Sequence, residues 1–113
     1  MIKDTIKEIL PNNIRYRIVE FKYNIYPHGI IKRWENERRP IPPPPAVKQK
    51  IVKDYQRKYN YQTFIETGTY LGYMVSVQKN RFKKIYTIEI GEDLYKRAKR
   101  KFKKYDHIEV LYG

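Results

Sequence analysis

The sequence predicts an α/β fold, namely the first half of a doubly wound parallel sheet preceded by a helical region. From residue 47 onward, short apolar runs alternate with patterns of helical period, in the order helix, strand, helix, strand, helix, strand. A proline-rich stretch separates this part from an N-terminal region with apolar residues at helical spacing. We therefore expect a helical extension at 1–39, a connector at 40–46 and a truncated sheet domain at 47–113.

The composition fits one small globular domain. The 113 residues include 12 Tyr, 4 Phe and 1 Trp, which is enough aromatic material for a core. The net charge of +13 would attract phosphate groups, but Lys outnumbers Arg and no nucleic-acid-binding motif accompanies these residues. A solvated, charged surface is therefore favoured over direct nucleic-acid binding.

The residue types also bear on location and metals. The chain has no Cys, and its two histidines, His28 and His107, lie far apart in the sequence, so we predict no metal site. No apolar run approaches the roughly 20 residues of a membrane span. The first ten residues carry acids as well as bases and lack the apolar core of a secretory signal. We therefore expect a cytoplasmic protein.

The N-terminal region is expected to be helical. Apolar residues recur at helical spacing over 2–10, and Pro11 ends this pattern. The stretch 14–26 fits both a strand and a helix, and we favour a helix. Pro-His-Gly at 27–29 is expected to break it, and a further short helix is predicted at 30–39.

The proline-rich stretch is predicted to be a stiff connector. Prolines fix φ and remove backbone donors, so residues 40–45 are expected to form an extended polyproline II segment. Arg39, Pro42 and Pro45 also match a spacing that proline-recognising domains bind. An interaction module without catalysis is therefore an alternative, although a connector is favoured.

The second region begins with a strongly amphipathic helix over 46–59, which is expected to stop at Asn60. Its predicted apolar face carries Val47, Ile51, Val52, Tyr55 and Tyr59. The elements expected next are a strand at 63–67, a helix with Leu71, Met74, Val75 and Gln78 on one face, a strand at 84–90, a helix over 91–105 and a strand at 107–112.

The turn after the first strand, in the sequence TFIETGTYLG at 63–72, is the candidate site. Gly68 allows a sharp turn, and Gly72 allows close approach at the helix start, where backbone N–H groups are free to meet a ligand. Glu89 ends the second strand 21 residues after Gly68, a spacing typical of an acid that binds ribose hydroxyls. A plain crossover with a solvated Glu89 is the alternative.

Together, FIETGTYLG, IYTIEI and HIEVLYG resemble the start of a class I S-adenosylmethionine-dependent methyltransferase, over about residues 47–113. The first motif of that family is acid-x-Gly-x-Gly-x-Gly, and here Tyr70 replaces the middle glycine, as in a Glu-Thr-Gly branch of the family. The resemblance implies a Rossmann-like fold, S-adenosylmethionine as cofactor, Glu66 and the loop 67–72 against its methionine part, and Glu89 on its ribose. The implied cofactor-binding residues are Glu66, Thr67, Gly68, Thr69, Tyr70, Gly72 and Glu89.

An NAD-binding fragment is the competing interpretation. NAD sites share the glycine turn and the ribose acid, but a pyrophosphate needs a close-approach glycine where this chain has Tyr70. S-adenosylmethionine is therefore favoured.

Members of the family that this sequence resembles continue beyond a third strand, whereas this sequence ends at Gly113. We therefore expect a truncated methyltransferase part without turnover, we assign no catalytic residue, and the methyl acceptor is unknown. A missing neighbour would leave the first strand with an unpaired edge, so we expect marginal stability or self-association. A basic nucleic-acid-binding module built on 96–105 is a further alternative.

Overall fold

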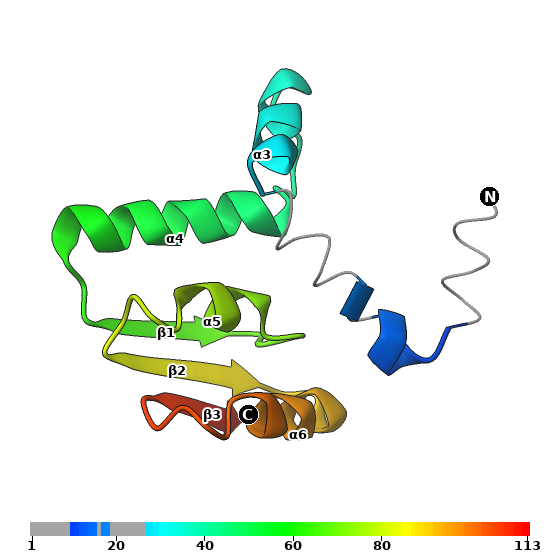
Figure 1. Ribbon diagram of the computed structural model, residues 1–113, viewed down its shortest axis with the longest axis vertical. Coiled ribbons are helices and arrows are strands. Elements are labelled where there is room, and N and C mark those ends of the chain that lie inside the picture. Colours follow the sequence, from blue (N-terminus) through cyan, green and yellow to red (C-terminus); the bar gives the residue numbers. More distant parts are fainter. Residues whose placement is uncertain (1–9, 16, 19–26) are drawn as a thin grey trace. The chain divides into compact units, whose positions relative to one another are not determined.

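The computed structural model describes residues 10–15, 17–18 and 27–113 (Figure 1). Contacts between residues divide the chain into two compact units, 1–46 and 47–113. Among the described residues, no helix combines the length and apolar character needed to cross a membrane.

The first unit is helical over much of its described part. Residues 12–15 and 17–18 are helical, in agreement with the helix favoured from residue 14 onward, whereas the helix expected over 2–10 lies outside the described residues except for its last residue. Helix α3 spans Pro27–Asn36. Its first residue is a proline because the N–H that proline lacks has no partner in the first turn of a helix. The helix predicted at 30–39 is present but begins earlier, at Pro27, and ends at Asn36, whereas the break expected before it lies outside the described residues.

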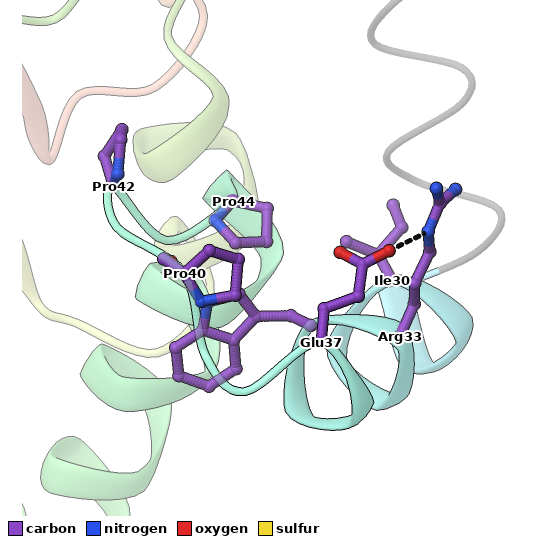
Figure 2. Close-up of a pocket in the computed structure, with 7 residues that line it drawn as sticks. Ile30, Arg33, Glu37, Pro40, Pro42 and Pro44 are labelled. Carbon is purple, nitrogen blue, oxygen red and sulfur yellow. Dashed lines mark hydrogen bonds and ion pairs between the residues drawn. The ribbon is translucent and has the colours of Figure 1, made fainter.

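The proline-rich stretch is bent, and the expected extended segment is not found. Residues 41 and 42 form a bend that contains a cis Ile41–Pro42 peptide bond. The indole Nε1 of Trp34 donates a hydrogen bond of 2.8 Å to the carbonyl oxygen of Pro40, so the chain folds back over α3. Figure 2 shows Pro40, Pro42 and Pro44 of this stretch beside α3.

The second unit contains the α/β elements in the predicted order. These are α4 (Pro45–Tyr59), β1 (Thr63–Thr67), α5 (Tyr73–Gln78), β2 (Lys84–Glu89), α6 (Glu92–Lys101) and β3 (Ile108–Tyr112). The three strands are parallel and lie in the order β1-β2-β3 (Figure 1). The predicted fold class, an α/β fold with a Rossmann-like parallel sheet, is confirmed.

One face of the sheet forms the core. Alternate residues of the strands, including Phe64, Ile85 and Ile108, pack with residues from all three helices. Val75 of α5 and Ala98 of α6 belong to this cluster, and α4 also contributes to it. Within residues 47–113, helices therefore pack against one face only.

The opposite face, here called the uncovered face, carries the alternate strand residues Ile65, Tyr86, Ile88 and Leu111. Ile65 is 65% exposed and Leu111 is 38% exposed. Parallel sheets usually have both faces covered, because their crossover helices lie on both sides. The uncovered face is therefore partly apolar and partly charged, since the Lys84–Glu109 ion pair of 3.4 Å also lies on it.

Two helices differ from the prediction. Helix α6 ends at Lys101 and does not reach residue 105, because Phe102 closes it with an N–H bond to the carbonyl of Ala98. The predicted apolar face of α4 is confirmed at Val47 and Val52. It is wrong at Ile51, Tyr55 and Tyr59, which are about half exposed, whereas Gln49 is buried. Helix α4 does end before Asn60, as predicted.

Candidate functional site

The loop between β1 and α5 crosses the end of β2. The N–H of Gly68 donates to the carbonyl oxygen of Ile88 at 2.7 Å, which holds the loop over the second strand. Gly68 (φ 80°), Tyr70 (φ 51°) and Gly72 (φ 78°) all adopt the left-handed conformation. A Cβ at Gly68 would meet no atom within 4 Å, so there is open space beside this turn. The sharp turn predicted at Gly68 is present.

Glu89 lies at the carboxyl end of β2 and binds the loop directly. Its Oε2 accepts a hydrogen bond of 2.8 Å from the N–H of Tyr70, and its Oε1 accepts one of 2.8 Å from the N–H of Gly91. These bonds, with a further one from the amide of Ile90, lower the pKa of the Glu89 carboxyl. The side chain is only 6% exposed. Glu89 is therefore an ionised, oriented carboxylate beside the turn, and not a solvated strand-end residue.

Glu66, on β1, belongs to a second polar network. Its Oε1 accepts a hydrogen bond of 2.8 Å from the hydroxyl of Thr87, which also shares a hydrogen bond with the hydroxyl of Thr69. Burial raises the pKa of Glu66 to about 7, although the bond from Thr87 opposes this shift. When Glu66 is ionised, Thr87 must donate to it, so the hydroxyl hydrogen between Thr87 and Thr69 comes from Thr69. The proton of one carboxyl thus sets the direction of hydrogen bonds that reach the loop.

Gly72 has a different role from the one predicted. A Cβ at this position would lie 2.8 Å from the ring of Phe102, so the glycine allows α6 to pack against the loop. Lys101 strengthens this contact, since its Nζ donates to the carbonyl oxygen of Leu71 at 3.1 Å. The helix that follows, α5, has only six residues. The close approach at Gly72 is therefore made by an aromatic side chain of the protein.

The structure brings together most of the predicted residues in two linked groups. Glu89 holds Tyr70, and Glu66 reaches Thr69 through Thr87, while Thr67 is exposed at the end of β1. Sequence reasoning missed Thr87. The available signal was a polar residue within an apolar strand, which the parallel register places directly opposite Glu66.

A separate hollow of about 340 Å³ lies in the first unit, between α3 and the proline-rich stretch. Ile30, Trp34 and Pro44 line it, and the Arg33–Glu37 ion pair of 2.8 Å lies at its side (Figure 2). None of the predicted site residues belongs to this hollow.

Comparison with known proteins identifies solved structures with a similar fold. No family model and no curated protein matches the sequence. Among solved structures, the chain is similar to the SAH-bound methyltransferase PaMTH1 of Podospora anserina, with a TM-score of 0.53 and 20% identity over 93% of this chain and 52% of that one. It is also similar to a Staphylococcus aureus protein described as a caffeoyl-CoA O-methyltransferase, with a TM-score of 0.51 and 18% identity over 88% of this chain and 51% of that one. The likeness is one of fold, and the chain spans about half the length of these two proteins.

Proposed function

We propose that residues 47–113 form the S-adenosylmethionine-binding part of a class I methyltransferase, in the branch whose first motif begins Glu-Thr-Gly. The observation that carries this proposal is the hydrogen bond from the N–H of Tyr70 to Glu89. It joins the left-handed turn and the strand-terminal carboxylate at one point, outside the carboxyl ends of parallel strands. Ligands of open α/β sheets bind at that position.

The residues present fit the cofactor. Gly68 leaves open space on the loop, and the Glu89 carboxylate offers about four lone-pair sites, of which backbone amides use three. One acceptor site of Glu89 is therefore left for a ribose hydroxyl, and a second becomes free if the N–H of Tyr70 is released. Exposed Ile90, beside Glu89, adds apolar surface for a flat ring.

Glu66 is suited to a cationic group. Its pKa of about 7 means that it is only partly ionised at neutral pH, and a nearby ammonium group would favour the ionised form. The α-ammonium of the methionine part is such a group. When bound, S-adenosylmethionine supplies a methyl group on an activated sulfonium, and this chain's residues bind and orient the molecule that carries it. We assign no residue of this chain to the binding of the methyl acceptor.

The test is isothermal titration of S-adenosylhomocysteine into the 113-residue chain and into the Glu89→Ala variant. Loss of a charge-assisted hydrogen bond predicts about tenfold to hundredfold weaker binding. Glu92→Ala is the matched control, because Glu92 is an exposed acid three residues further on that pairs with Lys96. Equal affinity of the wild-type and Glu89→Ala chains would refute the site, and binding of NAD in place of S-adenosylhomocysteine would refute the cofactor.

A further inference from the structure

The second half of α4 and the segment that follows it expose three aromatic rings in a row. Tyr55, Tyr59 and Tyr61 are 56%, 49% and 52% exposed. Their ring centroids are 6.0 Å and 5.4 Å apart along the row, and both pairs are tilted by 31°. Isolated exposed tyrosines are ordinary, but contiguous exposed aromatic surface marks an interaction site. Two members of this tyrosine row, Tyr55 and Tyr59, belong to the helix face that the sequence predicts to be apolar.

An apolar groove of about 220 Å³ adjoins the tyrosine row. Tyr55 and Tyr61 line it together with Val52, Phe64 and Phe82. Phe64 and Phe82 stack with their centroids 5.2 Å apart. The groove therefore offers a flat apolar group contact with phenol rings and with a stacked aromatic pair.

The same helix carries unneutralised positive charge. Its cations are Lys48, Lys50, Lys53, Arg57 and Lys58, and its one acid, Asp54, is paired with Lys50 at 2.6 Å. The Nζ of Lys58 lies 5.1 Å from the ring centroid of Tyr59, which places a cation directly on the tyrosine row.

A cation cluster lies on another side of α4. Arg57 and then Arg81 are the largest influences that lower the pKa of Lys53, so these three cations lie close together. Gln78 fixes this arrangement, because its Nε2 donates to the carbonyl oxygen of Gln49 and so ties the turn before β2 to α4. Crowded cations favour an anionic ligand.

The basic segment that the sequence singles out at 96–105 lacks these properties. On α6, Lys96 pairs with Glu92 at 2.8 Å, and Lys101 donates to a loop carbonyl. Tyr95 packs against Tyr112 with ring centroids 5.3 Å apart, and it is the one aromatic residue within α6. Tyr112 is 60% exposed and the Nζ of Lys99 lies 5.8 Å from the ring centroid of Tyr95, so α6 offers one ring pair with a cation, whereas α4 and the residues after it offer three consecutive exposed rings.

We infer that α4 and its groove bind single-stranded nucleic acid. Bases stack on the tyrosine row and enter the groove, while phosphates meet Lys58 and the cluster of Lys53, Arg57 and Arg81. Aromatic rings beside cations suit single strands of any sequence, because every base has a stacking face and every nucleotide a phosphate. The groove lies at the start of β1 and the candidate cofactor loop at its end, about 15 Å apart along the strand. The inference therefore stands independently of the proposed function.

The test is fluorescence anisotropy of a fluorescein-labelled oligouridine 12-mer with the 113-residue chain, at 50 mM and 200 mM salt. Tyr59→Ala is expected to weaken binding about tenfold, whereas Tyr59→Phe keeps the ring and the affinity. Arg57→Gln with Lys58→Gln is expected to weaken binding and to flatten its salt dependence. Lys99→Gln on α6 with Lys103→Gln in the turn after it is the matched control, and it is expected to change the affinity less.

Four outcomes would overturn the inference. They are an unchanged affinity of Tyr59→Ala, equal binding of a duplex of the same length, equal effects of the α4 and α6 substitutions, and absence of binding by the wild-type chain. A second copy in the groove would instead show as an oligomer that Tyr59→Ala dissociates while the labelled strand stays free. Far-UV circular dichroism of every variant checks the fold, and Tyr55→Gln replaces Tyr59→Ala if that variant unfolds.

Discussion

Glu66→Gln should stabilise the protein in alkaline but not in acidic solution. The pKa of Glu66 is raised from 4.5 to about 7 in the folded protein. Between these values the folded chain holds a proton that the unfolded chain has lost, so the free energy of unfolding falls as the pH rises through this window. Below about pH 4.5 Glu66 is protonated in the folded and the unfolded chain, and the free energy of unfolding has its full value. Above about pH 7 Glu66 is ionised in both, so the free energy of unfolding stays at its lowered value.

The magnitude follows from the same shift. The pKa of Glu66 rises by about 2.5, and each pKa unit corresponds to 1.36 kcal/mol. At pH 8 the ionised Glu66 therefore lowers the free energy of unfolding by about 3 kcal/mol. Glutamine keeps an oxygen that can accept the hydrogen bond from Thr87 and carries no charge. The variant should therefore gain up to about 3 kcal/mol at pH 8 and almost nothing at pH 4.5.

Thermal unfolding followed by circular dichroism at pH 4.5 and pH 8 measures this difference. A gain of this size corresponds to a rise of about 10 °C or more in Tm at pH 8 for a domain this small. Glu92→Gln, at an exposed residue paired with Lys96, serves as the control and should change little at either pH. An equal gain from Glu66→Gln at both pH values, or a loss at pH 8, would show that burial does not raise the pKa of Glu66.

Three further predictions concern the loop and the sheet. Thr87→Val removes the hydroxyl that bonds Glu66, so the midpoint of the Glu66 carboxyl in an NMR pH titration should move upward, and an unmoved midpoint would exclude the bond. Gly72→Ala should destabilise the chain by about 1–3 kcal/mol in urea, because its φ is 78° and a Cβ would overlap an aromatic ring, whereas Gly29→Ala in α3 meets open space and should be neutral or stabilising. If the uncovered face drives self-association, Ile65→Lys should lower the mass measured by light scattering, and a wild-type chain that is strictly monomeric would contradict the expectation.

The sheet was predictable from the sequence because its strands are short apolar runs between glycine or charged turns. The register was not, because apolar runs can slip, and the register is what places Thr87 opposite Glu66. The candidate site was therefore predicted as residues but not as a network. Gly68 and Glu89 follow from turn geometry and spacing, whereas the hydrogen bond from Tyr70 to Glu89 depends on how the loop folds back.

Part of the face of α4 was predicted wrongly for a definable reason. Helical spacing counts Tyr55 and Tyr59 as apolar, but a tyrosine hydroxyl can stay in water, and half-exposed rings are tolerated. Gln49 counts as polar and yet is buried, and its carbonyl oxygen accepts a hydrogen bond from the side-chain amide of the buried Gln78. Such pairing depends on tertiary contacts, and the bend in the proline-rich stretch has a similar origin in the bond from Trp34.

The strand order β1-β2-β3 has a consequence for folding kinetics. Each parallel pair joins consecutive strands, with Thr63 opposite Lys84 and Ile85 opposite Ile108, so no pairing must wait for a distant segment. Short sequence separations favour fast folding. We expect this sheet to form early and then to present Ile65 and Leu111 to solvent for as long as nothing covers them. The tendency of the sheet to aggregate then depends on how long the uncovered face stays exposed to solvent. Conditions that shorten this exposure during translation should raise the yield of folded protein.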